Sequence, residues 1–373
     1  MYSRWTSHNI THVGLCVVFL SMMMVITRAS HVRACTAAYH APSHFMLKSY
    51  DWHDGAGDLY LNPRGVSRVA FGHEASLADV KTQSTPHRWS ARYASLSFNQ
   101  YGRGYPNGGI NESGLALEVL WLNEAQASKI DQRPYLNELE WVQYVLDTQS
   151  TVSDVLEVAE QVRISPIHGQ VHYMTCDVTG VCATLELLKG ELVVHTGQDL
   201  PHPVLTNHTY QRSLSHYQSL DAPPRSSERG SLARFATAAH TVKNPEPQRL
   251  IQALRALDRV KIAGYTQWQI AYDLKRHRVA FRTALSSTPR QVGLEALIKS
   301  APQNAQGCAA TLTYPLSRRD QGLINQHFKP PQLKIERRQL RIRLKRLGLS
   351  AKLADALSEH GARCTDTRPS HPE

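Results

Sequence analysis

Cysteine is scarce in this sequence, and six residues in 373 are too few for a disulfide-rich scaffold. The apolar run at residues 13–26 carries no charge, but its 14 residues are too few to span a bilayer comfortably. The sequence also lacks internal repeats, a glycine-rich phosphate loop and any His or Cys spacing typical of a metal site. We therefore expect no metal and no cofactor.

The composition is typical of a folded globular protein, with 42% hydrophobic and 20% charged residues. The length suits one large domain or two ordinary ones. The formal net charge is +11, and most of the excess lies in one late segment. This distribution favours a solvated basic tail over a nucleic-acid-binding surface, so we expect no nucleic acid partner.

Residues 1–34 have the pattern of a secretory signal. Arg4 precedes the apolar run, and Val32 and Ala34 are small enough for the positions three and one before a cut. We expect cleavage before Cys35 and export to the periplasm or the medium. Two alternatives stay open. The segment could remain as an uncleaved anchor, or a lipid could be attached to Cys35, which would block both its thiol and its amine.

Cleavage before Cys35 would place a free α-amine and a thiol on one residue. Such a residue can supply a nucleophile and its base without a separate histidine. Residues 35–39 and 45–50 are predicted to form two short paired strands, which would bring Lys48 and Asp51 beside Cys35. A nearby cation favours the thiolate, and a carboxylate can hold the terminal amine.

The segment Cys35-Thr36, followed by Ser49-Tyr50-Asp51-Trp52, resembles the choloylglycine hydrolase and penicillin V acylase family. Members of this family are amide hydrolases with an N-terminal nucleophile. Residues 109–115, Gly-Ile-Asn-Glu-Ser-Gly-Leu, are similar to another family motif. Lys48 stands where the family has arginine, which keeps the positive charge but loses the bidentate fork. The resemblance covers roughly residues 35–300 and implies an α+β fold, the four-layer αββα sandwich of N-terminal-nucleophile hydrolases.

Three further site residues follow from the resemblance. Asn207, in the Leu-Thr-Asn segment, is implied as an oxyanion donor, and Arg234 as an arginine that reaches the active site. Trp121 is similar to the tryptophan of the Gram-negative type and would line a substrate pocket. The alternatives are core packing for Trp121 and a solvated helix position for Arg234.

The implied function is hydrolysis of linear amides. The Cys35 sulfur would attack the carbonyl, with Asp51 and Arg234 positioning the nucleophile and Lys48 adding positive charge. Penicillin V and acyl homoserine lactones are the favoured N-acyl substrates. The alternatives are a bile salt hydrolase and an inactive periplasmic or lipid-anchored binding protein. The second alternative stays open because Lys48 replaces the family's arginine. The resemblance also implies a homo-oligomer, a tetramer.

Periodicity predicts the remaining elements. Packing helices are expected at residues 136–147, 151–162, 231–242 and 247–257, and a β-meander at 170–176, 182–189 and 191–196. A paired strand and return strand are expected at 266–273 and 278–285. Cys176 and Cys182 lie on either side of a predicted hairpin tip. The sequence is compatible with a disulfide between them and equally with two reduced thiols.

Residues 301–373 are predicted to form a basic extension that is partly helical. Between Lys334 and Arg346 there are seven basic residues and one acid, and leucines at helical spacing make one apolar face. Such a helix can pack on its own domain or make weak contact with an anionic membrane surface.

Overall fold

The computed structural model describes residues 34–76, 84–222, 224–225, 227–244, 247–302 and 307–362. All of them belong to one compact unit that runs from Arg33 to Glu373. The expected signal segment is residues 1–34, of which residues 1–33 lie outside the described residues. In the part of the chain that is described, no helix is both long and apolar enough to cross a membrane.

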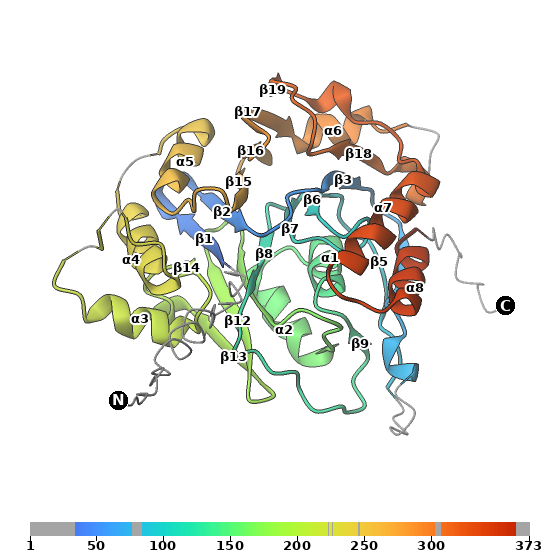
Figure 1. Ribbon diagram of the computed structural model, residues 1–373, viewed down its shortest axis with the longest axis horizontal. Helices are drawn as coiled ribbons and strands as arrows, with labels where there is room; N and C mark the ends of the chain where they lie inside the picture. Colours follow the sequence, from blue (N-terminus) through green and yellow to red (C-terminus); the bar gives the residue numbers. More distant parts are fainter. Residues whose placement is uncertain are drawn as a thin grey trace, which may run out of the picture. The chain divides into compact units, whose positions relative to one another are not determined.

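Two large β-sheets form the centre of the fold (Figure 1). The seven-stranded sheet has the order β14 (Val204–Leu205), β1 (Ala34–His40), β2 (Phe45–Asp51), β15 (Thr266–Asp273), β16 (Arg278–Thr283), β17 (Ser286–Gly293) and β19 (Gly322–Leu323). The eight-stranded sheet has the order β13 (Glu191–Thr196), β12 (Cys182–Leu188), β11 (Val171–Cys176), β8 (Ala116–Trp121), β7 (Gly108–Asn111), β6 (Ser95–Asn99), β3 (Asp58–Asn62) and β18 (Leu312–Pro315). Two smaller pairs join β9 (Tyr135–Leu136) to β10 (Arg163–Ile164) and β4 (Ser67–Val69) to β5 (Arg88–Ser90).

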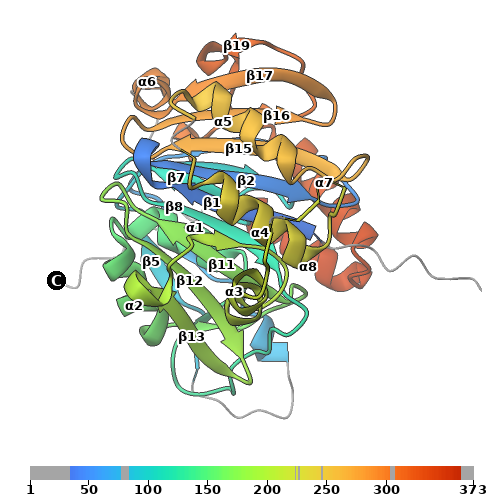
Figure 2. The same cartoon turned by 90° about the vertical axis from the view of Figure 1, so that its left-hand side faces the viewer.

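Helices cover the outer faces of both large sheets, as Figures 1 and 2 show. On the seven-stranded sheet lie α4 (Ser231–Thr241) and α5 (Leu250–Ala256), and α3 (Tyr210–Gln218) packs against α4. On the eight-stranded sheet lie α1 (Glu140–Thr148) and α2 (Val152–Gln161). Apolar side chains of the two facing sheets, such as Met46, Ile110 and Ile270, make the central core. The order helix, sheet, sheet, helix confirms the expected αββα sandwich.

The predicted helix at 136–147 starts later than expected, at Glu140. Leu136 instead pairs with Ile164 in the β9–β10 pair. Asn137 then ends the extended segment, because its Oδ1 accepts the backbone N–H of Glu140 at 2.9 Å. The helix that starts after Thr151 agrees with its capping box, in which Thr151 and Asp154 satisfy each other's backbone N–H groups.

The predicted meander is confirmed as β11, β12 and β13. Its hairpin tip is closed by a disulfide between Cys176 and Cys182, whose Cα atoms are 4.1 Å apart. Cys308 is also in a disulfide. Cys364 lies outside the described residues.

The region after residue 300 is part of the same unit. It follows α6 (Leu294–Ser300), and its strand β18 pairs with β3 at the edge of the eight-stranded sheet. Two helices follow, α7 (Leu333–Arg346) and α8 (Ala351–Ala362), and they pack against each other. Leu340 and Leu344 are the buried residues of α7, as expected for a helix that packs on its own domain.

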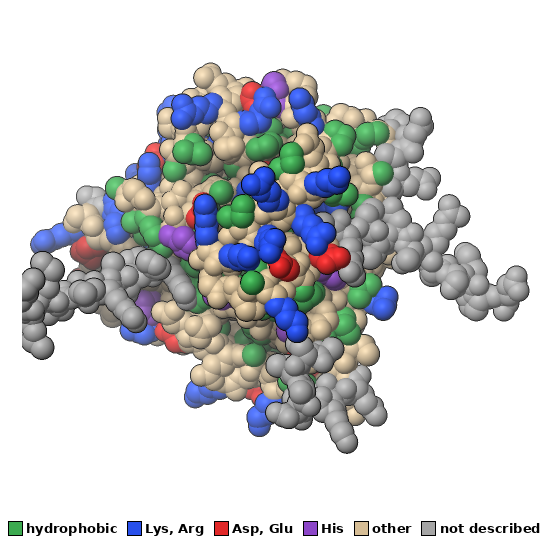
Figure 3. All heavy atoms as spheres, turned by 45° about the vertical axis from the view of Figure 1, so that its right-hand side comes forward, with side chains coloured by type: hydrophobic (Ala, Val, Ile, Leu, Met, Phe, Trp, Pro, Cys, Tyr) green, Lys and Arg blue, Asp and Glu red, His purple; other side chains and the backbone are tan. Residues whose placement is uncertain are grey.

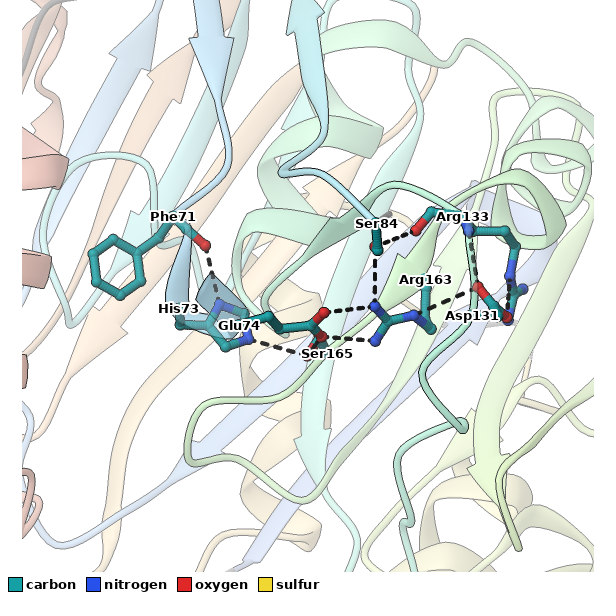
Figure 4. Close-up of polar contacts among 8 residues, drawn as sticks. All are labelled: Phe71, His73, Glu74, Ser84, Asp131, Arg133, Arg163 and Ser165. Atoms are coloured by element: carbon teal, nitrogen blue, oxygen red, sulfur yellow. Dashed lines mark hydrogen bonds and ion pairs between the residues drawn. The ribbon is translucent and has the colours of Figure 1, made fainter. Parts of the chain in front are cut away.

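A buried ionic network fixes the turn at residues 73–76 against β10 (Figure 4). Arg163 donates two hydrogen bonds of 2.7 Å to the two carboxylate oxygens of Glu74. Burial opposes ionisation of Glu74, but the hydrogen bonds from Arg163 and Ser165 outweigh it and hold the pKa below its ordinary value. His73 adds a contact of 3.0 Å to Ser165. This network lies apart from Cys35 and has a structural role.

Candidate active site

Cys35 lies near the start of β1, between β14 and β2. Its side chain is only 4% exposed, and it is the one free cysteine among the described residues. The β1–β2 register pairs Cys35 with Tyr50 and Ala34 with Asp51. The hairpin therefore brings Asp51 beside the peptide bond that precedes Cys35, as the sequence predicts.

Asn207 and Arg234 hold the main chain of Cys35. The backbone N–H of Cys35 donates to Asn207 Oδ1 at 2.7 Å. Arg234 reaches in from α4, donating from Nη2 to the same Asn207 oxygen at 2.7 Å and from Nη1 to the carbonyl of Cys35 and to Thr36 Oγ1. Arg234 is 2% exposed, so the solvated alternative for this residue is wrong.

Burial lowers the pKa of Arg234, while the nearby Asp51 and Cys35 act in the opposite direction. Asn207 is fixed in turn, since its Nδ2 donates to the carbonyl of Trp121 at 2.8 Å. Three predicted residues from distant segments, Cys35, Asn207 and Arg234, are thus joined by direct hydrogen bonds.

Asp51 is fully buried at the end of β2. Its Oδ1 accepts hydrogen bonds from Ser49 and Thr266. Its Oδ2 is also buried and, within the residues that the structure describes, accepts no hydrogen bond. Burial raises the pKa of Asp51, against the opposing effects of Arg234 and of these hydrogen bonds. The carboxyl group therefore has one oxygen available for another donor.

Lys48 lies on the same face of the seven-stranded sheet as Cys35, and its side chain extends across the space between the two sheets. Its ammonium group lies 3.3 Å from Glu118 on β8 and donates to the carbonyl of Val119 at 2.5 Å. Glu118 also accepts a hydrogen bond of 2.5 Å from Tyr272. Burial raises the pKa of Glu118, and Lys48 opposes that rise. Lys48 thus acts on the site through its charge, without a hydrogen bond to the thiol.

Sequence reasoning missed Glu118, which lies in a strand that is otherwise apolar from Leu115 to Leu122. A single acid in such a strand is usually interpreted as facing solvent. The signal available was the charge of Lys48, which also lies in a buried strand and needs a counterion.

Burial is the main influence on the Cys35 thiol and raises its pKa. Lys48 is the largest opposing influence. Asp51 acts in two ways, because its charge raises the pKa of the thiol while a hydrogen bond from its backbone lowers it. In the described chain, where the nitrogen of Cys35 is part of a peptide bond, the sulfur is therefore held mainly as a neutral thiol at pH 7.

A pH profile of alkylation tests this state. For the unprocessed chain, the iodoacetamide reaction at Cys35 should have its midpoint above the pH at which an ordinary cysteine thiol ionises, because a raised pKa delays thiolate formation to higher pH. The midpoint is the readout, since burial also slows access. A Cys35→Ala variant supplies the blank, and a midpoint below the ordinary value would contradict the burial argument.

An apolar cavity of about 100 Å³ opens beside Cys35. Trp121 lines it and is only 8% exposed, so the residue is both a pocket wall and a packed side chain. Its ring lies 5.9 Å from that of Trp52, centre to centre. Among the described residues, no group of His, Cys, Asp and Glu could hold a metal ion. The arrangement suits nucleophilic attack by a cysteine on a ligand with an apolar part.

Comparison with known proteins gives several similarities. A family model for linear amide C–N hydrolases, choloylglycine hydrolase family, matches residues 79–253. This range contains Trp121, Asn207 and Arg234. Penicillin V acylase of Pectobacterium atrosepticum is 24% identical over 384 aligned residues, which cover 87% of this chain and 97% of the relative.

Two solved structures are similar in fold. Penicillin V acylase from Agrobacterium tumefaciens has a TM-score of 0.66 and 21% identity, covering 80% of this chain and 98% of that one. A variant of conjugated bile acid hydrolase from Clostridium perfringens has a TM-score of 0.60 and 16% identity, covering 78% and 98%.

Proposed function

Since the chain belongs to the choloylglycine hydrolase family of linear amide C–N hydrolases, we propose that it hydrolyses N-acyl amides with the sulfur of Cys35 as nucleophile. The proposal includes export, and removal of residues 1–34 by a signal peptidase or by self-cleavage. Both steps would precede activity, because the base in this mechanism is the α-amine of Cys35 itself.

The observation that carries the proposal is the unpaired, buried Oδ2 of Asp51 beside the peptide bond to be cut. The backbone nitrogen of Cys35 has one hydrogen while it is part of a peptide bond. Cleavage turns it into a primary amine, which has at least two hydrogens to donate. Asn207 Oδ1 already accepts the hydrogen that is present. Asp51 Oδ2 is then available as a second acceptor that can orient the amine.

The reaction would proceed in two steps. The Cys35 sulfur attacks the amide carbonyl and its proton passes to the α-amine, directly or through water. The C–N bond then breaks, the proton goes to the leaving amine, and a thioester remains on Cys35. Water attacks the thioester, the α-amine again accepts a proton, and the carboxylic acid leaves with the thiol restored.

Asn207 can support the oxyanion that forms at each attack. Its amide nitrogen has two hydrogens, and one of them is donated to the carbonyl of Trp121. We expect the other to stabilise the oxyanion, a contribution of about 2.7–4 kcal/mol to the transition state. Arg234, which bonds Asn207 and the Cys35 carbonyl, would keep both groups in position.

The apolar cavity supports an acyl group as the part of the substrate that is recognised. We favour penicillin V and acyl homoserine lactones as substrates, because the chain is similar to penicillin V acylase and because Trp121 lines the cavity. Conjugated bile acids, the substrates named for one structural relative, are the competing class.

A panel of acyl amides tests the function. Protein whose N-terminus has been verified as Cys35 is offered penicillin V, acyl homoserine lactones and glycine-conjugated bile acids, and the released acid is measured by chromatography. We expect release from the first two classes, and none from a Cys35→Ala preparation of equal folded content. Release of acid from none of the three by protein that begins at Cys35 would refute the proposal.

A further inference from the structure

The cavity beside Cys35 is bordered on one side by the last helices of the chain. Four leucines from this region line it together with the nucleophile. Leu344 and Leu347 come from α7 and its end, Leu349 from the connection, and Leu357 from α8. Residues that are more than 300 positions from Cys35 thus lie in the same pocket.

An apolar cluster holds this wall against the rest of the domain. Leu340, Leu344, Ala354 and Leu357 pack with Tyr105, which is 5% exposed. Tyr105 is itself a lining residue of the cavity. Any change in where α7 and α8 sit is therefore transmitted directly to the shape of the pocket.

Polar contacts of α7 reinforce the wall. Arg343 donates to the carboxylate of Asp58 at 3.2 Å and to the carbonyl of Gln100 at 3.0 Å. Gln100 in turn accepts a hydrogen bond from Tyr50, which lines the cavity next to Cys35. Arg341 pairs with Asp355 and so joins α7 to α8.

Figure 3 shows Lys and Arg side chains gathered on the face that comes forward from the right-hand side of Figure 1. On α7, Arg337 and Arg346 pair with Glu359 and Asp54, at 3.5 and 3.7 Å. Charges at the surface and leucines beneath it give these helices two faces, and the apolar face is turned to the pocket.

Several polar groups of the lining are occupied elsewhere, whereas the buried hydroxyl of Tyr105 has no hydrogen-bond partner among the described residues. Glu138 accepts the backbone N–H groups of residues 167–169. Asn137 Oδ1 accepts the backbone N–H groups of Leu139 and Glu140, and Asn107 accepts the backbone N–H of Gln100 at 2.8 Å. Apart from the reacting end at Cys35 and the Tyr105 hydroxyl, the lining is therefore mainly apolar.

We propose that α7 and α8 form the distal wall of an acyl pocket, and that Leu344, Leu347, Leu349 and Leu357 set which acyl chains are accepted. The inference rests on the proposed function, and it names the substrate class as amides of uncharged, mainly apolar acyl groups. An engineered apolar cavity of about 150 Å³ binds benzene, so a space of about 100 Å³ that is open on one side suits a short alkyl chain or one aromatic ring.

Chain length is the first readout. N-acyl amides from butanoyl to dodecanoyl are compared by kcat/KM, and each methylene that enters the pocket should raise it by about fourfold, equivalent to about 0.8 kcal/mol. The gain should stop where the chain meets the wall. Leu357→Ala shortens a buried wall residue and should move the optimum to longer chains. Leu347→Trp, at a half-buried position, should move it to shorter ones.

Ile342 is the matched control, because it lies on α7 but is 43% exposed and does not line the cavity. Ile342→Ala should leave the optimum where it is in the wild type. If Leu357→Ala does not fold, Leu349→Ala tests the same wall from the half-buried connection between the helices.

The affinities of the free carboxylic acids, measured by calorimetry, distinguish the proposal for the pocket wall from the proposed hydrolase function. If amides are hydrolysed but neither wall variant moves the length optimum, the wall inference is overturned while the proposed function stands. If no amide is hydrolysed but the affinity for acids still depends on chain length and shifts in Leu357→Ala, the wall stands and the proposed function falls.

Discussion

Replacing Cys35 with serine or alanine should reduce the hydrolysis of every N-acyl substrate by on the order of 10⁵-fold or more, the scale seen when a covalent nucleophile is lost. The sulfur is the only protein atom in this mechanism that forms a covalent bond to the acyl carbon of the substrate. A serine hydroxyl has about the same position but a much higher pKa, so the α-amine cannot activate it equally well. Initial rates of acid release on a penicillin V or acyl homoserine lactone substrate provide the measurement.

The disulfide at the hairpin tip offers a matched control for this loss. Replacing both Cys176 and Cys182 with serine removes two sulfurs from β11 and β12 while leaving the bonds around Cys35 in place. This double variant should unfold at a lower temperature but keep its rate per folded molecule. Turnover that persists in Cys35→Ala would show that another group carries the chemistry.

Glu118→Gln should cost about 3–5 kcal/mol of unfolding free energy, the usual range when one partner of a buried ion pair is removed. Lys48 is fully buried and Glu118 is 2% exposed, so the ammonium group that is left has no solvent to compensate it. The carbonyl of Val119 remains as a partner, but it carries no charge. Urea denaturation monitored by tryptophan fluorescence gives the change in unfolding free energy.

The double variant Lys48→Met with Glu118→Leu separates charge from packing. Removing both charges should recover most of the lost stability, since an apolar pair of similar volume is often as stable as a buried ion pair. The same variant should raise the pH at which the Cys35 thiol is alkylated, because Lys48 is the main influence that lowers the pKa of this thiol. A single Glu118→Gln variant that loses less than about 1 kcal/mol would contradict the buried ion pair.

Much of the site follows from local sequence. Asp51 lies beside Cys35 because a short hairpin pairs their two strands, and hairpin pairing is a short-range property. Asn207 and Arg234 lie in segments far from Cys35, and only the family resemblance connected them to it. Their direct bonds to the main chain of Cys35 agree with that connection.

The misses share a physical cause, because each depends on a contact between distant segments. Glu118 and Lys48 are 70 positions apart, and although a lysine in a buried strand needs a counterion, its strand does not indicate which residue supplies it. The start of α1 shifted to Glu140 because Leu136 pairs with Ile164 of a later strand. The leucine face of α7 was predicted from its spacing, but its position beside Cys35 could not be, since spacing does not specify a partner.

The most direct test of the account compares two preparations that differ by one residue at the N-terminus. One begins at Cys35 and the other at Ala34, and both keep the same thiol, the same pocket and the same Asp51, Asn207 and Arg234. Intact mass confirms each start, and acid release per folded molecule is measured at pH 7. The account predicts turnover by the chain that begins at Cys35 and none by the chain that begins at Ala34. Equal turnover by both would show that the α-amine of Cys35 is not the base.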